Sequence, residues 1–334
     1  MRAVVIEHPG SVGVRQAPDP TPGPMDIVVA VRACGVCGTD LHIMQGEFPP
    51  TPYPIIPGHE FSGEVVEVGA SVPGSLVRTG QRVAVDPSLF CGYCPPCRRG
   101  QGNLCENWAA IGDTVSGAFA EYVKVPAANA YALPEHLDYR TGALVEPLSC
   151  AVHGLARVGD VLAKRVLVVG AGTMGLLLQQ LLLRAGAASV TAVDRQASRL
   201  EAAKHLGAEA VATDLAELGD ERFDICVDAT GAPAAIEGAF DRLERGGTLL
   251  LFGVANADVS TALSPFRIYN DELTVVGSMA VLHSFGEAVD LLATGAVDPK
   301  PLLATDPFPL DGFTDALDAV RTGRGVKVQV DPTA

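Results

Sequence analysis

A glycine-rich turn between two apolar runs, at residues 166–183, constrains the fold of this chain more than any other feature. Gly170, Gly172 and Gly175 stand in the spacing G-x-G-x-x-G, directly after a predicted buried strand and directly before a predicted helix. In this setting the first glycine makes the turn, the second lets the backbone approach a pyrophosphate, and the third packs the helix against the strand. The sequence therefore predicts an α/β unit with a doubly wound parallel sheet and a dinucleotide site.

Further residues of the predicted dinucleotide site lie beside this turn. Thr173 and Met174 belong to the start of the helix, whose free N–H groups and positive dipole end favour phosphate. Asp194 ends the next predicted strand, where a carboxylate binds the adenosine ribose and repels a 2′-phosphate. Arg195 and Arg199 are also candidate cofactor contacts, and an arginine beside this position can accommodate NADP. The pattern favours NAD; the alternative is a glycine-rich turn with a chance acidic residue.

The order of predicted elements divides the chain into two domains. Residues 1–150 contain short apolar runs separated by glycine and proline, which are typical of an antiparallel β domain. From about residue 165 to residue 278, strands and helices alternate as in a doubly wound parallel sheet. Two helical segments and a final strand follow. We expect a β domain at 1–153 and 295–334, and an inserted dinucleotide-binding domain at 154–294.

The charge balance excludes two classes of partner. The 334 residues include 39 acidic and 24 basic side chains, for a formal net charge of −15. Such a charge repels phosphate backbones and anionic lipid, so we expect neither nucleic-acid nor membrane partners. The uncharged stretch 166–183 is long enough for a weak membrane-span candidate, but it contains three glycines and divides into strand, turn and helix. Glu7 stands where a signal peptide needs apolar residues, so we predict a cytoplasmic location, in which disulfides are disfavoured.

Four cysteines in a lobe at about residues 88–108 form the most specific pattern in the chain. Cys91, Cys94 and Cys97 follow the spacing C-x-x-C-x-x-C, and Cys105 lies in the same loop, which is rich in glycine and proline. Four thiolates this close together suit a tetrahedral zinc with no exchangeable position, which is a structural site. Two disulfides or an iron–sulfur cluster are the alternatives.

A second, more dispersed set offers a different kind of zinc site. Cys37, His59, Glu60 and Glu146 would supply one thiolate, one imidazole and carboxylates, and three such ligands leave a position open for water or substrate. The pair Cys34-x-x-Cys37 also fits a thioredoxin-like redox motif, although no thioredoxin-type unit surrounds it. Taken singly, His59 and Glu146 are typical of hydrogen-bonded structural residues. The set therefore predicts a catalytic zinc only as a group.

The order and spacing of these motifs, over residues 1–330, resemble the zinc-dependent medium-chain dehydrogenases, and most closely the branch of sorbitol and threonine dehydrogenases. The resemblance rests on CGVCGTDLH, PGHEFSGEVVEVG, ALVEPLSCAVHG, VLVVGAGTMG and the four-cysteine lobe. It implies a GroES-like β domain and a Rossmann domain. It also implies that Cys37, His59 and Glu60 bind the catalytic zinc, and that Glu146 binds it directly or through a water.

The resemblance further implies an activity and the parts that serve it. Thr39 would receive the proton of the substrate hydroxyl, and His42 would pass it outward. Two zinc ions per subunit, one catalytic and one structural, and NAD would serve the oxidation of a secondary alcohol. Enzymes of this branch are typically homotetramers, so we expect a homotetramer or a homodimer. A non-catalytic nucleotide-binding protein with a decayed site is the alternative from another class.

Two substrate classes follow from the resemblance: a neutral polyol, cyclitol or vicinal diol, and L-threonine. A bound carboxylate favours an arginine partner, and residues 268–320 include no arginine. Ala280 stands where sorbitol-type enzymes carry an arginine. We therefore expect a neutral alcohol, in a pocket with Met279, Ile43 and Phe48 as wall residues.

Overall fold

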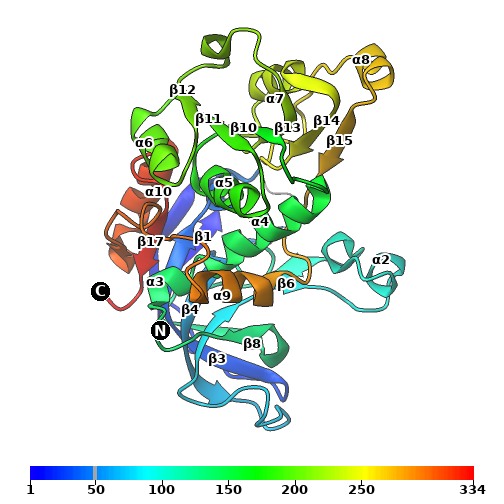
Figure 1. The fold of residues 1–334 in the computed structure, drawn as a ribbon. Helices are drawn as coiled ribbons and strands as arrows, with labels where there is room; N and C mark the ends of the chain where they lie inside the picture. Colours follow the sequence, from blue (N-terminus) through cyan, green and yellow to red (C-terminus); the bar gives the residue numbers. More distant parts are fainter. Residues whose placement is uncertain (48–50) are drawn as a thin grey trace. The chain divides into compact units, whose positions relative to one another are not determined.

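The chain forms two compact units (Figure 1). The computed structural model describes every residue except 48–50. The first unit consists of three segments, Met1–Ser149, Val281–Gly295 and Leu303–Ala334. The second unit consists of two segments, Cys150–Ala280 and Ala296–Leu302.

These limits differ from the predicted domain limits at residues 150–153, which belong to the second unit, and where the chain returns to the first unit. Residues 281–295 join the first unit, where the ring of Phe285 packs on that of Tyr131 with their centroids 4.8 Å apart. Residues 296–302 stay with the second unit, where the side chain of Gln180 bonds the backbone of Asp298. A helical pattern does not say which core a helix covers, so the sequence could not assign these segments.

The first unit is built around a sheet with the strand order β16-β17-β3-β4-β5-β9, in which β8 also pairs with β3. Its neighbouring strands are antiparallel except β16 and β17, in agreement with the expected antiparallel domain. Two separate pairs, β1 with β2 and β6 with β7, complete its strands. The strands are β1 (Arg2–His8), β2 (Ser11–Gln16), β3 (Asp26–Val36), β4 (Glu60–Val68), β5 (Arg82–Val85), β6 (Ser88–Leu89), β7 (Ala109–Ala110), β8 (Tyr122–Pro126), β9 (Ala130–Ala132), β16 (Phe308–Pro309) and β17 (Val328–Asp331).

The register of the central strand β3 gathers distant residues at one edge of the sheet. Gly35 of β3 pairs with Glu60 at the start of β4, and the start of β17 pairs with the end of β3. Cys37 follows β3, His59 precedes β4 and Lys327 precedes β17. β3 holds this place because almost all of its side chains are buried in the core of the unit. The antiparallel pairing therefore places three distant parts of the chain side by side.

The helices of the first unit are mostly short. α1 starts directly after Cys37, whose backbone N–H donates to Oδ2 of Asp40 at 2.8 Å and so closes the first turn. The helices are α1 (Gly38–Gln45), α2 (Pro95–Arg98), α3 (Tyr139–Gly142), α4 (Val145–Val158, within which the unit limit falls), α9 (Phe285–Ala293) and α10 (Phe313–Thr322), with 3-10 turns η1 (Gly102–Leu104), η2 (Ala127–Asn129) and η4 (Leu310–Gly312).

The second unit is a six-stranded parallel sheet with the order β12-β11-β10-β13-β14-β15. This order places the two halves of the sheet on either side of β10, as the doubly wound fold requires. Helices α5, α6 and α7 pack against its strands (Figure 1). The elements are β10 (Arg165–Val169), α5 (Thr173–Arg184), β11 (Ser189–Val193), α6 (Ala197–His205), β12 (Ala210–Ala212), η3 (Leu215–Leu218), β13 (Phe223–Asp228), α7 (Pro233–Asp241), β14 (Leu243–Leu251), α8 (Pro265–Asn270) and β15 (Thr274–Gly277).

The apolar stretch 166–183 divides as the sequence predicts, into β10, a glycine turn and α5. Within the described part of the chain, no helix combines the length and the apolar character that crossing a membrane would take.

Candidate metal centres and dinucleotide site

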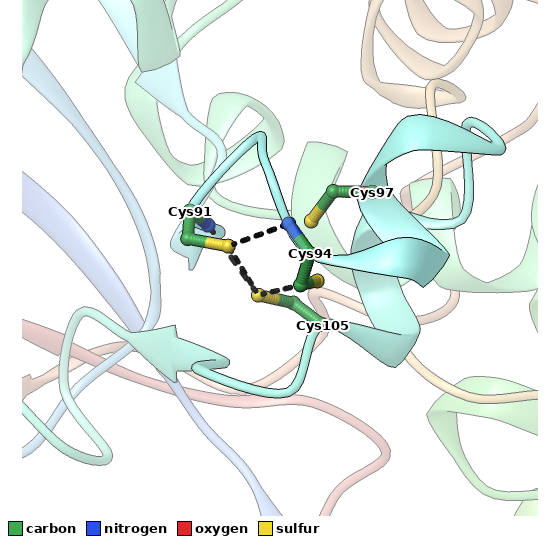
Figure 2. Close-up of side chains that lie close together, drawn as sticks. All are labelled: Cys91, Cys94, Cys97 and Cys105. Atoms are coloured by element: carbon green, nitrogen blue, oxygen red, sulfur yellow. Dashed lines mark hydrogen bonds between the residues drawn. The ribbon is translucent and has the colours of Figure 1, made fainter.

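Four cysteines from one loop turn their sulfur atoms toward one another (Figure 2). All four Sγ atoms lie within 4.8 Å of one another, and that of Cys105 lies 3.6 Å from Cys91 and 3.8 Å from Cys94. A zinc tetrahedron with Zn–S bonds of about 2.3 Å places its sulfurs about 3.8 Å apart, so this group, which also includes Cys97, fits a zinc ion. The separations are far too long for disulfides, and all eight cysteines are free.

Backbone N–H groups of this loop lower the pKa of Cys91 and Cys94, whereas burial raises the pKa of Cys97 to about 12. Cys94 N donates to Cys91 Sγ at 3.4 Å, and Cys91 N and Asn107 N each donate to Cys105 Sγ at 3.3 Å. Burial raises the pKa of Cys91, but the backbone N–H groups of Tyr93 and Cys94 lower it, so that its pKa is about 6. The thiolate is the form that binds a metal.

Cys37, His59 and Glu60 form a second donor group, with one sulfur, one ring nitrogen and one carboxylate oxygen within 4.8 Å of one another. Cys37 is the N-cap residue of α1. His59 and Glu60 are 6% and 2% exposed. A mixed sulfur, nitrogen and oxygen set of this kind suits zinc, so the donors fit the ion that the sequence predicts. Cys34 is fully buried and is not a member of this group of described residues.

Lys327 is a partner of this group that the sequence analysis missed. Its ammonium group lies against Oε2 of Glu60 and donates to the carbonyl of Val36 at 3.1 Å. Burial alone would lower the pKa of Lys327, but the Glu60 carboxylate raises it above the usual value, so the lysine stays charged. Gly35 leaves the space for this pair, because a Cβ there would collide with both side chains. Glu60 is thus shared between the donor group and a buried cation.

Two buried carboxylates face the imidazole of His59. Its Nδ1 lies 3.1 Å from Oδ1 of Asp113 and 4.0 Å from Oδ1 of Asp40. Burial alone would lower the pKa of His59, but the Asp113 carboxylate raises it well above the usual value. Burial also raises the pKa of Asp40 to about 6. Because Nδ1 lies against these carboxylates, we expect Nε2 to be the nitrogen that binds a metal.

The other predicted ligand, Glu146, is in α4 and is 9% exposed. It is not part of the tight group of described donors. Its charge nevertheless acts on the buried ammonium of Lys327, so it belongs to the same charged surroundings. Its direct or water-mediated contact with a metal stays a prediction.

The two predicted relay residues lie on α1, next to the donor group. The Sγ of Cys37 donates to Oγ1 of Thr39 at 3.7 Å. The Nδ1 of His42 lies 2.8 Å from Oε2 of Glu47, just beyond the helix. Nothing in the sequence marks Glu47, because an acid that follows a helix end is common and carries no spacing signal. One short helix and its N-cap residue therefore carry the sulfur, the hydroxyl and the imidazole.

The predicted glycine turn joins β10 to α5. Gly170 has a φ of +99°, and a Cβ on Gly175 would collide with the carbonyl of Gly170. Both positions therefore need glycine for steric reasons. Gly172 is the N-cap residue of α5, and a Cβ there would meet no backbone atom within 4 Å, so the backbone is accessible at this point. Thr173 and Met174 begin the helix and are half-buried.

Asp194 lies beside this turn. Its Oδ2 accepts from Ala171 N at 2.8 Å, and its Oδ1 accepts from Gln196 N at 2.8 Å. Nη1 of Arg199 lies 3.6 Å from Oδ2, whereas Arg195 is exposed. Of the two predicted arginines, the structure therefore brings Arg199 to the carboxylate.

A second turn at the same edge of the sheet was missed. Asp228 ends β13 and is fully buried. Its carboxylate accepts from Thr230 N at 3.0 Å, from Thr230 Oγ1 at 2.6 Å and from Gly231 N at 3.1 Å. The signal in the sequence was an acidic residue that ends an apolar strand and is followed by a glycine. Ligands of doubly wound sheets bind at this carboxyl edge.

The predicted pocket residues have different environments. Ile43 is fully buried and packs with Ile6 and Ile55, so its assignment to a pocket wall was wrong. It lies on the core-facing side of α1, which the sequence analysis did not assign to a helix. Met279 is 40% exposed in the second unit. Phe48 lies outside the described residues.

Comparisons with known proteins identify the family. The model described as alcohol dehydrogenase GroES-like domain matches residues 23–135, and the model described as zinc-binding dehydrogenase matches residues 173–294. The chain is 35% identical to D-arabinitol dehydrogenase 1 of Uromyces fabae, over 99% of this chain and 97% of that protein. It is also 35% identical to an L-threonine 3-dehydrogenase of Saccharopolyspora erythraea, over 100% of this chain and 99% of that protein.

A solved structure agrees over the whole chain. A zinc-binding dehydrogenase of Sinorhizobium meliloti 1021, bound to NADP, superposes with a TM-score of 0.94 and 37% identity, over 99% of each chain. The predicted fold class and the family resemblance are thereby confirmed. With a GroES-like domain and a Rossmann-type dinucleotide-binding domain, the chain belongs to the zinc-dependent medium-chain alcohol dehydrogenases.

Proposed function

We propose that this protein oxidises a secondary alcohol of a neutral polyol, cyclitol or vicinal diol, with transfer of a hydride to NAD. The observation that carries the proposal is the group of Cys37, His59 and Glu60, three donors of different chemistry within 4.8 Å of one another. A closed structural site does not need such a mixed set, whereas a catalytic zinc keeps a position free for substrate. Bound zinc would supply Lewis-acid stabilisation of the deprotonated substrate hydroxyl.

The residues on α1 support a path for the proton. Thr39 lies next to the donor group, with its hydroxyl 3.7 Å from the sulfur of Cys37, so it is placed to accept a proton from a substrate hydroxyl. His42 continues this path. Its ring is oriented by the contact of 2.8 Å with Glu47, and its side chain is 28% exposed, so it can release the proton to water.

The second unit supports the choice of cofactor. The open backbone at Gly172 and the start of α5 suit a pyrophosphate, and the Asp194 carboxylate suits the ribose hydroxyls of NAD. Bound NAD would accept the hydride. Arg199 offsets part of the Asp194 charge, and the relative from Sinorhizobium meliloti was solved with NADP. We propose a preference for NAD that is limited by this arginine.

The substrate proposal rests on charge. Residues 268–320 hold no arginine that could pair with the carboxylate of an amino acid. One relative in this family is named for D-arabinitol, a polyol, and another for L-threonine. A carboxylate loses more from a missing cation than a hydroxyl chain loses from one fewer hydrogen bond. L-threonine is therefore the second candidate.

Three further parts of the proposal concern the molecule as a whole. We propose two zinc ions per subunit, a structural ion at Cys91, Cys94, Cys97 and Cys105 and the catalytic one. We also propose a homotetramer or homodimer, supported by the open edge strand β15. A cytoplasmic location is consistent with eight free cysteines.

Steady-state kinetics with zinc-replete protein test the function. Polyols, cyclitols, vicinal diols and L-threonine are compared as substrates with NAD, and kcat/KM is measured for each by the formation of NADH. We expect the highest kcat/KM with a neutral polyol, cyclitol or diol. A higher value with L-threonine than with all of these would overturn the substrate class. Binding of NADH without turnover of any alcohol would support the non-catalytic alternative.

A further inference from the structure

Asp113 connects the end of the four-cysteine lobe with His59 of the proposed catalytic donor group. It lies in the turn after β7, directly beyond the four-cysteine lobe, yet its Oδ1 lies 3.1 Å from Nδ1 of His59. Asp113 and His59 are each 6% exposed. A carboxylate and an imidazole this deeply buried interact with little screening by water. The Asp113 carboxylate is therefore placed to affect the orientation and charge of the His59 ring.

The turn that carries Asp113 is held by its own hydrogen bonds. The carbonyl of Ala110 accepts from Thr114 N at 2.9 Å, and Ala110 N donates to Thr114 Oγ1 at 2.8 Å. Gly112 N donates to Val115 O at 2.7 Å. Both ends of the turn are thus tied together. The carboxylate is presented by a fixed backbone.

The same turn is pressed against the backbone that carries His59. A Cβ on Gly112 or on Gly117 would collide with the carbonyl of Gly58, the residue before His59. Backbone hydrogen bonds of 2.7 and 2.9 Å from the segment after the turn hold this contact. The backbone on both sides therefore fixes the separation of Asp113 and His59.

The second carboxylate near His59 is already committed. Oδ2 of Asp40 accepts the backbone N–H of Cys37 at 2.8 Å and so caps α1. Its Oδ1 lies 4.0 Å from Nδ1 of His59, beyond hydrogen-bond distance. Asp113 is the nearer of the two acids by about 0.9 Å, from 4.0 and 3.1 Å.

We infer that Asp113 is a positioning residue whose carboxylate pairs with Nδ1 of His59, so that the ring keeps its orientation and presents Nε2 to the metal. The inference rests on the proposed role of His59 as a zinc ligand. A carboxylate behind a metal-binding histidine fixes its tautomer and raises its basicity, and its loss typically lowers metal affinity by about 10- to 100-fold. Asp113 acts through His59 and does not touch substrate.

The test compares metal binding in four variants of the full chain. Asp113→Ala removes the carboxylate, and Asp113→Asn keeps its shape and one acceptor without its charge. Asp306→Asn, at an exposed position of the same unit, is the matched control. Cys37→Ser removes a proposed ligand. The dissociation constant of the more labile zinc is measured by chelator competition, and the absorption spectrum is recorded after cobalt replaces that zinc.

We expect Asp113→Ala to raise the dissociation constant by about 10- to 100-fold and to shift the cobalt bands, with the zinc of the four-cysteine lobe and the circular dichroism unchanged. Asp113→Asn is expected to raise the constant by about three- to tenfold, with a cobalt spectrum close to that of the wild type, and Asp306→Asn is expected to change neither. If Asp113→Ala does not fold, the Asn variant carries the test.

Two results distinguish failure of the Asp113 inference from failure of the proposed metal centre. A dissociation constant within twofold of wild type in the folded Asp113 variants, with unchanged cobalt bands, overturns the inference while the proposed function stands. If Cys37→Ser also leaves metal content and spectrum unchanged, the proposed metal centre is wrong and the inference falls with it.

Discussion

The ammonium group of Lys327 lies against the carboxylate of Glu60, and the two residues are 3% and 2% exposed. Replacing one partner of a buried ion pair leaves the other charge without compensation. For the metal-free protein, we expect Lys327→Met to lower the free energy of unfolding by about 3–5 kcal/mol, as measured by denaturant titration. Lys124→Met, at an exposed position in β8, is the matched control. A loss below about 1 kcal/mol in Lys327→Met would show that Glu60 is balanced in another way.

The two metal sites differ in how tightly they hold zinc. The four-cysteine group is closed by four sulfurs, whereas Cys37, His59 and Glu60 provide only one. We expect a chelator to abolish activity before it unfolds the protein, with one of two zinc ions lost at that stage. Zinc content, activity and circular dichroism measured along one chelator titration check the order. Full activity with a single zinc per subunit would contradict the prediction.

Two glycines of the dinucleotide turn have different predicted roles: Gly175 in packing and Gly172 in cofactor binding. Gly175→Ala places a Cβ on the carbonyl of Gly170, so we expect a loss of stability of about 1–3 kcal/mol together with loss of NADH binding. Gly172→Ala meets no such obstacle and should keep the Tm of the wild type while it weakens NADH binding. Thermal unfolding and NADH fluorescence titration measure the two effects. Equal Tm values for both variants would contradict the steric argument.

Coenzyme preference depends on Asp194 and Arg199. Asp194→Ser removes the charge that repels a 2′-phosphate, so the ratio of kcat/KM for NAD to that for NADP should fall at least about tenfold, or about 1.4 kcal/mol. Arg199→Ala removes the cation 3.6 Å from Asp194 and should raise the ratio. Initial rates with both coenzymes give the ratios. A wild-type protein with the higher kcat/KM for NADP would refute the role assigned to Asp194.

The open edge of the second unit predicts self-association. β15 ends the sheet, and α8, just before it along the chain, exposes Phe266 and Tyr269 at 70% and 82%. We expect oligomers in sedimentation velocity and smaller species after Phe266→Asp combined with Tyr269→Asp. Leu162→Asp, at another exposed apolar position of this unit, should leave the oligomer intact. A wild-type monomer at all concentrations would rule out the prediction.

Local motifs were predictable because residues that are close together in the sequence also lie close together in the structure. Gly170, Gly172 and Gly175 describe one turn, and the lobe cysteines lie within one loop, so no long-range pairing is needed to bring them together. The α/β class followed from the alternation of elements. The donor group of Cys37, His59 and Glu60 was predicted as a set from its donor chemistry, and the order of the motifs supported that prediction.

Two of the missed residues, Lys327 and Asp113, reach the donor group from distant parts of the chain. Lys327 precedes a strand that pairs beside β3, and Asp113 belongs to a turn that packs on the residue before His59. A single lysine or aspartate carries no spacing pattern, so nothing in the sequence marks its partner. Ile43 was misassigned for a related reason, since the face of α1 that it occupies depends on packing with Ile6 and Ile55.

The pairing of Glu60 with Lys327 also sets an order of events during protein synthesis. Glu60 emerges from the ribosome with β4, but its balancing cation emerges only after α10. A nascent chain that folded β3 against β4 earlier would bury an uncompensated carboxylate, at a cost of several kcal/mol. The ion pair of Glu60 and Lys327 can therefore form only after the segment between α10 and β17 has been synthesised.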